Sequence, residues 1–194
     1  MTREAPRRES FAERRERRAA VEDPQVVLEA AGRFLEARPR SIAEVRRRLG
    51  GAGYRCELVE GAIAKLLEFG VLDDDAFART WVESRDRMRP RGERAIRQEL
   101  GLKGIDRATI DLVLGERREA VAGLPSDDGE TMSPDRSAAE RLLARHARSL
   151  ARVADHGQRR QRAYALLARN GFDPEVCREV AATVALRDDD AETG

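Results

Sequence analysis

The chain has 194 residues, 38% of them charged, yet its 37 basic and 36 acidic side chains cancel to a formal net charge of +1. A soluble protein usually has about 25% charged residues, and the bases here are almost all arginine, because Lys65 and Lys103 are the only lysines. No apolar run approaches the roughly 20 residues of a membrane helix, and the N-terminus lacks the apolar core of a signal peptide. We therefore expect a cytoplasmic protein without membrane contact.

Residue types that build metal sites and catalytic centres are sparse. Cys56 and Cys177 have no CxxC spacing and no nearby His, and His146 and His156 complete no ligand set. We therefore predict buried structural thiols and no metal or other cofactor. The sequence also lacks the GxxxxGKS/T, HExxH and GxSxG motifs, so nothing in it argues for an enzyme.

The N-terminal part of the chain, residues 1–23, is a mixture of Arg and Glu. This composition predicts a charged extension that is either a frayed helix or disordered.

Beyond the extension, the chain repeats one short pattern three times: a Leu, three residues, a Gly and a large apolar residue. Gly tolerates the positive φ with which a helix commonly ends, and the apolar residue after it can pack back on that helix. An apolar-periodic stretch precedes and follows each copy. The copies are Leu49–Tyr54, Leu100–Ile105 and Leu167–Phe172, with Gly53, Gly104 and Gly171 at the turns.

This repetition predicts an all-α protein of three tandem three-helix-bundle repeats. We place repeat 1 at residues 24–72, repeat 2 at 73–115 and repeat 3 at 137–186. Repeats of about 45 residues are near the lower limit for independent stability, so we expect neighbouring repeats to contact one another. Three bundles in a row would form an elongated, curved molecule.

Repeat 2 opens with acidic residues followed by aromatic ones. Asp73 and Asp74 are predicted to be the N-cap and a first-turn acid of a helix, with contact to a partner as the alternative. Phe77 and Trp81 follow on that helix at a spacing of four residues, which favours a place in the core.

Acidic residues dominate the region between repeats 2 and 3. We predict an acidic linker over residues 116–136, because Gly123–Asp135 combines acids with Pro125, Gly129 and Pro134. A flexible linker would let repeat 3 move. Residues 187–194 are predicted to be an acidic tail.

Positive charge is concentrated around the second helix of each repeat. Glu36–Arg55 carries +4, Arg85–Arg107 carries +4 and Arg141–Arg169 carries +7. Such repetition predicts a basic surface for an anionic partner, although a solvated polar face or a biased genome composition would give the same residues. The candidate contacts are Arg46, Arg47, Arg91, Arg94, Arg97, Lys103, Arg159, Arg160 and Arg162.

The central region resembles the signature of the RecX family, regulators of the RecA recombinase. The resemblance lies in the runs Val71–Ala78 and Arg91–Ile105 and in Arg85 between them. Pro39–Leu49 and Tyr164–Phe172 resemble the first and third repeats of that family, whereas the long acidic linker and the charged extension depart from it.

The resemblance implies a non-enzymatic and monomeric regulator. Such a protein would bind the RecA nucleoprotein filament along its groove and make weak, sequence-nonspecific contact with single- and double-stranded DNA. It would thereby inhibit strand exchange and ATP turnover, or promote loss of the filament.

Two other functions remain open. A helix, a Gly turn and a second helix also describe a helix-turn-helix DNA-binding regulator, whose recognition helix should be rich in exposed Arg, Asn or Gln. The corresponding helices, Glu57–Phe69, Arg107–Leu114 and Pro174–Ala185, are neutral to acidic, which disfavours that function. A scaffold of helical repeats that contacts no nucleic acid is compatible with every residue.

Overall fold

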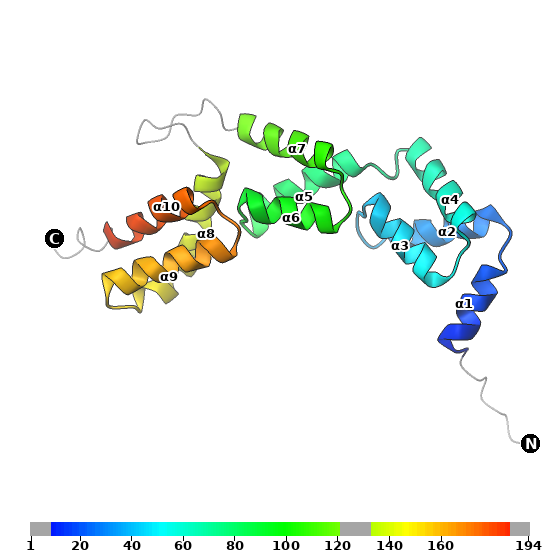
Figure 1. Cartoon of the computed structure of the whole chain (residues 1–194), viewed down its shortest axis with the longest axis horizontal. Helices are drawn as coiled ribbons and strands as arrows, with labels where there is room; N and C mark the ends of the chain where they lie inside the picture. Colours follow the sequence, from blue (N-terminus) through cyan, green and yellow to red (C-terminus); the bar gives the residue numbers. More distant parts are fainter. Residues whose placement is uncertain (1–8, 121–132, 187–194) are drawn as a thin grey trace, which may run out of the picture. The chain divides into compact units, whose positions relative to one another are not determined.

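Helices form all the regular structure of the residues that the computed structural model describes, 9–120 and 133–186 (Figure 1). No strand occurs in these two ranges, which confirms the predicted all-α class. The predicted acidic tail, residues 1–8 of the extension and residues 121–132 of the linker lie outside them. The helices are α1 (Phe11–Ala19), α2 (Pro24–Leu35), α3 (Ile42–Ala52), α4 (Cys56–Glu68), α5 (Asp74–Met88), α6 (Glu93–Leu102), α7 (Arg107–Glu119), α8 (Pro134–Ala151), α9 (His156–Arg169) and α10 (Pro174–Leu186).

Three helices correspond to each predicted repeat, α2–α4, α5–α7 and α8–α10, but the protein divides into two compact units. Unit 1 is Met1–Phe77 and unit 2 is Ala78–Gly194, so the boundary falls within α5. Unit 2 therefore contains repeat 3 and all of repeat 2 except the first turn of α5. The linker predicted over residues 116–136 is too long at both ends, because α7 continues to Glu119 and α8 begins at Pro134.

The core of unit 1 lies between α2, α3 and α4. Its apolar side chains recur every three or four residues, which gives each helix one apolar face. Gly53 has the predicted positive φ, 104°, and ends α3 before the chain turns toward α4. The buried side chains of this core are Val27, Ala31, Val45, Leu49, Val59, Ala62, Ile63, Leu66 and Leu72.

The N-terminus of α3 is held by side chains from two helices. The Ser41 hydroxyl accepts the Glu44 N–H at 3.2 Å, and the Glu44 carboxylate accepts the Ser41 N–H at 3.3 Å, which is a capping box. Asp74, in the first turn of α5, accepts the Ile42 N–H at 2.9 Å. Asp73 Oδ1 accepts the Ala76 N–H at 2.9 Å, which is the hydrogen bond of a helix N-cap. Both aspartates therefore contribute to the fold.

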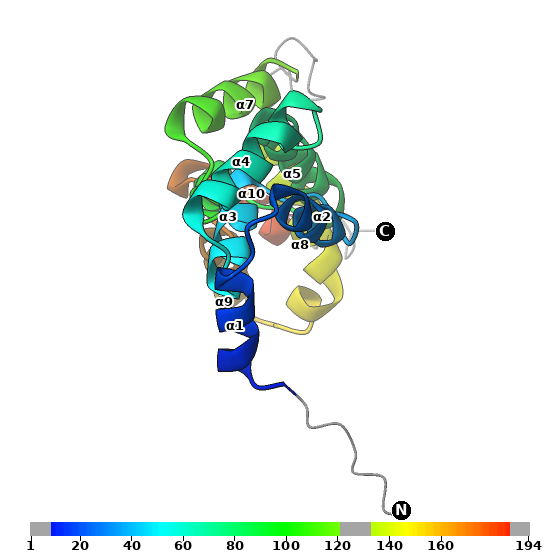
Figure 2. The same cartoon turned by 90° about the vertical axis from the view of Figure 1, so that its right-hand side faces the viewer.

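Part of the predicted extension is an ordered helix, α1, so the prediction of a frayed or disordered segment is wrong there. Ser10 and Glu13 cap it reciprocally, with hydrogen bonds of 3.2 and 2.7 Å. Near its other end, Arg18 donates to the Ala52 carbonyl at 3.4 Å and lies over the Tyr54 ring, 5.7 Å from the centroid. These contacts attach α1 to the C-terminal end of α3 (Figure 2).

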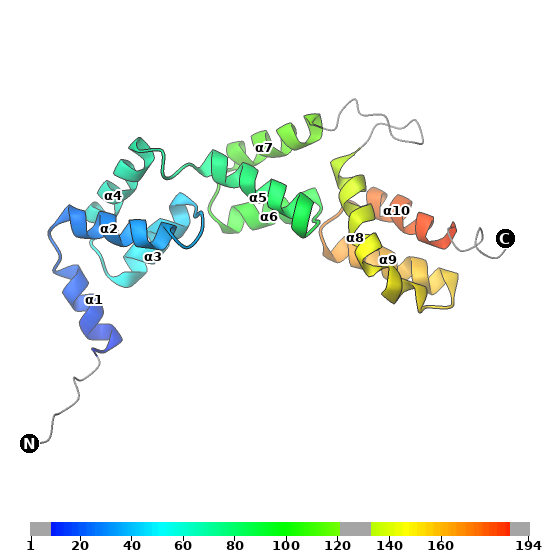
Figure 3. The same ribbon diagram turned by 180° about the vertical axis from the view of Figure 1, so that it is seen from behind.

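Repeat 3 packs α8, α9 and α10 around one apolar core (Figure 3). Gly171 follows α9 with the predicted positive φ, 79°, and the Phe172 ring after it packs back into the core. Repeat 2 has the same turn, with Gly104 at a φ of 81° and Ile105 buried. The buried side chains of the repeat 3 core are Ala138, Ala139, Leu142, Leu143, Leu150, Ala163, Leu167, Phe172, Cys177, Val180 and Ala181.

Repeats 2 and 3 meet backbone to backbone within unit 2. The N–H of Gly92, the N-cap residue of α6, donates to the Asn170 carbonyl oxygen at 3.0 Å. A Cβ atom at Gly92 would lie 2.3 Å from the Gly171 carbonyl oxygen, so the approach requires glycine. The composition of the linker predicts that repeat 3 can move, whereas these contacts hold it against repeat 2.

A buried ion cluster holds the same interface. Arg117 of α7, 8% exposed, donates two hydrogen bonds to Asp86 of α5, at 2.9 and 3.0 Å, and one to Asp135 of α8, at 2.6 Å. Asp135 also accepts the Glu93 N–H at 3.0 Å, at the start of α6. Burial alone would lower the pKa of Arg117. The hydrogen bonds to the two carboxylates outweigh this effect, so the pKa of Arg117 is raised overall and the guanidinium stays charged. Asp135, predicted to lie in the linker, is thus part of the interface.

Candidate partner-binding surface

The two candidate arginines of α3 have different surroundings. Arg46 donates to both carboxylate oxygens of Glu60 on α4, at 2.6 and 2.8 Å. This hydrogen-bonded guanidinium holds the pKa of Glu60 below its usual value. Arg47 is exposed, on the side of α3 away from the buried Val45 and Leu49. Arg46 is therefore neutralised within the fold, although both side chains are exposed.

Basic side chains around α6 are largely engaged by neighbouring helices. Arg97 binds Asp111 of α7, and this hydrogen bond lowers the pKa of Asp111. Arg91 donates to the Asn170 side-chain oxygen of repeat 3 at 2.7 Å, and its Nε lies 3.6 Å from a carboxylate oxygen of Glu99. Arg94 is exposed and has no carboxylate partner within the described part of the chain. Of these three candidates, Arg94 alone presents an unneutralised charge.

Lys103 belongs to a cluster around the Trp81 ring. Its Nζ lies 4.4 Å from the ring centroid, and the guanidinium carbon of Arg85 lies 4.3 Å from the same centroid. The Trp81 indole N–H donates to Glu99 at 2.8 Å, and Glu99 also binds Arg85 at 2.5 Å. Phe77, one turn earlier on α5, is buried. The contacts of Lys103 therefore favour a role in fixing Trp81 over contact with a partner.

The prediction that Arg159 lies on the exposed basic surface is wrong. The residue is 7% exposed, and its Nε–H donates to the Val153 carbonyl oxygen at 2.9 Å. Arg159 precedes the buried Ala163 and Leu167 by four and eight residues, which puts it on the core face of α9. Its guanidinium stabilises the α8–α9 turn from inside the fold.

Three of the candidate arginines in unit 2 are exposed and have no carboxylate partner within residues 9–120 and 133–186: Arg94 of α6 and Arg160 and Arg162 of α9. We call them the exposed arginine set. They come from repeats 2 and 3, which the contacts of Arg117 and Gly92 hold together. The separations between the arginine-bearing helices are therefore fixed by the fold.

A cavity of about 560 Å³ lies between α5, α7 and α8 in unit 2. Val82, Val113 and Ala120 give it an apolar part. Three arginines and three acids line it as well, so the lining carries no net charge that would attract an anion. The charged lining residues are Arg79, Arg117, Arg141, Glu83, Asp86 and Glu116.

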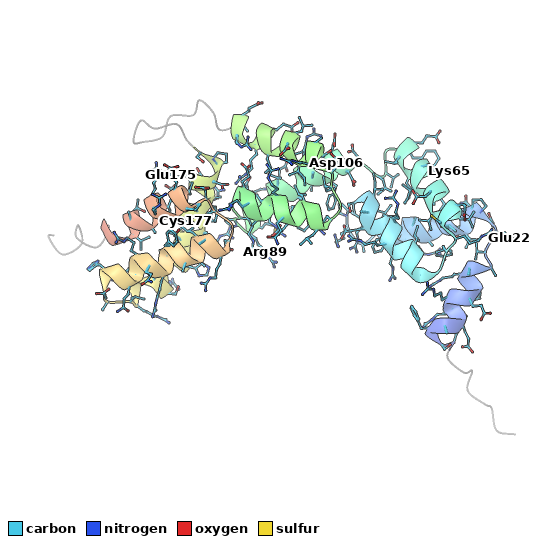
Figure 4. The ribbon with its side chains drawn as sticks, in the orientation of Figure 1. Glu22, Lys65, Arg89, Asp106, Glu175 and Cys177 are labelled. Atoms are coloured by element: carbon cyan, nitrogen blue, oxygen red, sulfur yellow. The ribbon has the colours of Figure 1, made fainter. Side chains whose placement is uncertain are left out.

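Metal chemistry finds no support in the described residues, which contain no group of three or more His, Cys, Asp or Glu side chains that could hold an ion. Cys177 of α10 (Figure 4) is buried, and burial raises the pKa of its thiol. Cys56 is exposed, so the prediction of two buried thiols is wrong for this residue. None of the described helices has the length and apolar character needed to cross a membrane.

Three-helix repeats with glycine turns and exposed arginines define an all-α helical-repeat protein. Residues 73–114, almost all of repeat 2, match the family model described as "RecX, second three-helix domain". Two mycobacterial proteins named "Regulatory protein RecX" are similar over most of their length. The Mycobacterium avium (strain 104) protein is 31% identical over 148 residues, 76% of this chain and 78% of that protein. The chain belongs to the RecX family of regulatory proteins.

The second of these relatives, from Mycobacterium ulcerans (strain Agy99), is 32% identical over 158 residues, 81% of this chain and 84% of that protein. The crystal structure of RecX from Lactobacillus salivarius superimposes with a TM-score of 0.65 at 18% identity, covering 84% of this chain and 97% of that one. At that identity the structural likeness shows a shared fold.

Proposed function

We propose that the chain binds the RecA nucleoprotein filament and inhibits its strand exchange and ATP hydrolysis. Membership of the RecX family of regulatory proteins supports a regulatory role. The observation that carries the proposal is the exposed arginine set, which lies on two repeats that form one unit. Arginine suits this role because its guanidinium binds carboxylate and phosphate in bidentate geometry.

The fixed separation of the repeats matters for affinity. Once one basic helix binds a filament, the other lies close to neighbouring acidic groups of the same filament, which raises the effective concentration of the second contact. Weak individual contacts then add to useful avidity without one deep binding pocket. A filament repeats its surface from subunit to subunit, so it offers such paired contacts.

A helix-turn-helix regulator, the alternative function, draws less support from the same residues. Its recognition helix would be the third helix of a repeat. In repeat 1 this helix, α4, has one base, Lys65 (labelled in Figure 4), and three acids, Glu57, Glu60 and Glu68. The net charge of this helix is negative, so the negatively charged phosphates of DNA would repel it. We therefore propose filament binding in preference to sequence-specific DNA binding.

Inhibition of RecA tests the proposal. We expect substoichiometric amounts of the chain to slow both strand exchange and DNA-dependent ATP hydrolysis by RecA. Replacing Arg94, Arg160 and Arg162 together with Ala should raise the concentration needed for half inhibition about tenfold or more, because charged contacts across an interface steer association and fix register. Circular dichroism checks that the variant remains folded.

The matched control replaces three arginines of unit 2 that bind acids, Arg79, Arg97 and Arg118. It removes the same charge from the same unit and should shift the half-inhibiting concentration by less than about threefold, because these guanidiniums already bind carboxylates of the chain. Loss of such exposed ion pairs should also cost little stability. The absence of any effect of the wild-type chain on either RecA rate would refute the proposed function. Equal shifts for the two triple variants would refute the role of the exposed arginine set.

A further inference from the structure

The cavity of about 560 Å³ in unit 2 lies at the junction of repeats 2 and 3. Repeat 2 contributes α5 and α7 to its wall, and repeat 3 contributes α8. Its volume falls within the range of roughly 300 to 1,000 Å³ that is usual for pockets that bind small organic molecules. A molecule in this cavity would contact both repeats at once.

Apolar side chains form one part of the cavity wall. Val82 of α5 and Val113 of α7 are 5% and 2% exposed, and Ala120 adds an apolar contact at the end of α7. Water against these groups finds few hydrogen-bond partners, so an apolar body that replaces the water is favoured. This part of the cavity therefore suits a hydrocarbon ring system or chain.

All three acidic side chains of the lining bind an arginine, each at 3.2 Å or less. The pairs are Glu116 with Arg79, Asp86 with Arg117 and Glu83 with Arg87. The negative charge of the lining is therefore offset locally by hydrogen-bonded guanidiniums. Among the described lining residues, an anionic group would meet no unpaired carboxylate.

The lining also contains one base that is poorly neutralised. Arg141 of α8 reaches only Asp86 within the described residues, at 3.9 Å, and Arg117 already holds that carboxylate at 2.9 Å. Ser137 lies one turn earlier on the same face of α8, and its hydroxyl makes no hydrogen bond within the described part of the chain. Helix α8 thus presents a guanidinium and a hydroxyl to the cavity, beside its apolar part.

We propose that this cavity binds a small amphipathic anion, namely an apolar ring system or chain that carries one oxyanion group such as a carboxylate or sulfonate. The apolar body would lie against Val82 and Val113, and the anionic group would accept hydrogen bonds from Arg141 and Ser137. A guanidinium matches the oxygens of such a group. Because the lining has no net charge, long-range attraction is weak and the apolar body supplies much of the affinity.

The test uses two fluorescent probes that differ by one group. Anilinonaphthalene sulfonate has an apolar ring system with one sulfonate, and N-phenylnaphthylamine has the same rings without the sulfonate. We expect both probes to bind the whole chain at one saturable site, with a rise in fluorescence. The titrations contain neither RecA nor DNA, so their result is independent of the proposed inhibition of the filament.

Two substitutions in the lining separate the roles of charge and of apolar surface. Arg141→Gln should weaken binding of the sulfonate probe about tenfold, because a charge-assisted hydrogen bond is lost. It should change the affinity for N-phenylnaphthylamine by less than about twofold, since that probe has no anionic group. Ala120→Phe, at a position that is exposed in the wild type, puts a ring into the cavity and should weaken both probes about tenfold or more.

The matched control is R148Q, which removes the same charge from α8 two turns further on, outside the lining. It should leave both affinities within about twofold of the wild type, because exposed charges at that distance are largely screened. Equal losses of both probes in R141Q would overturn the proposed recognition of an anion.

Three further outcomes would overturn the proposal. The first is the absence of saturable binding to the wild type, and the second is unchanged binding to A120F, which would place the probe elsewhere on the chain. The third is weaker inhibition of RecA by A120F when the wild type binds neither probe, which would assign the cavity to an apolar side chain of a protein partner. If A120F is unfolded by circular dichroism, Ser137→Leu fills the cavity from α8 and gives the same test.

Discussion

Replacing Arg117 with Ala destabilises unit 2 by about 3 to 5 kcal/mol, because removal of one partner leaves buried carboxylates without a counter-charge. The side chain of Arg117 is 5% exposed, and those of Asp135 and Asp86 are 14% and 27% exposed, so water only partly replaces the lost guanidinium. Trp81, the only tryptophan, lies in unit 2, and its fluorescence during urea unfolding measures the loss.

A nearby arginine provides the control for this prediction. Arg118 binds Glu93 at 2.8 Å, but its side chain is 54% exposed, so Arg118→Ala should cost less than about 1 kcal/mol. The triple variant R117M/D86N/D135N should recover much of the stability, because it leaves no buried charge unpaired and keeps an acceptor for the Glu93 N–H. An Arg117→Ala protein within about 1 kcal/mol of wild type would contradict the structural role of the cluster.

The second large effect concerns Gly171, whose replacement with Ala should cost about 2 to 4 kcal/mol. Its φ of 79° is strained for any residue with a Cβ. The new Cβ would also lie 2.4 Å from the Ala95 Cβ and 2.5 Å from the Ala95 nitrogen, so repeats 2 and 3 would have to separate. Thermal unfolding followed by circular dichroism and by Trp81 fluorescence measures the effect.

Gly101 is the matched control, since an added Cβ there meets nothing within 4 Å. It lies within α6 in the same unit, and Gly101→Ala should stabilise the helix by about 0.5 to 1 kcal/mol. Opposite signs for the two substitutions separate the interface effect from ordinary helix propensity. If Gly171→Ala unfolds at the wild-type temperature, the close approach of the repeats is not required for stability.

Local features of the fold could be predicted because their signals are local. A helix that ends with Leu, three residues and Gly carries its turn signal within six residues, and Gly53, Gly104 and Gly171 all have positive φ. Composition was less informative at the ends of the linker. Asp135 lies in an acidic stretch, yet it accepts hydrogen bonds from two other helices.

Ion pairs between helices could not be predicted from charge windows along the chain. Arg46 and Arg97 each find an acid 14 residues away on the next helix, Glu60 and Asp111. Whether such side chains meet depends on how the helices pack. The net charge of a sequence window gives no information about that packing. The burial of Arg159 did have a signal, because the residue shares the helical stripe of Ala163 and Leu167.

Direct binding to the RecA filament tests the central claim. Cys56 is exposed and Cys177 is buried, so a thiol-reactive fluorophore can be attached at Cys56 of the folded chain. We expect the anisotropy of the labelled chain to rise to saturation as RecA filaments on single-stranded DNA are added, and the affinity to fall as salt is raised. An anisotropy that stays at the value of the free chain at every filament concentration would contradict the proposed function.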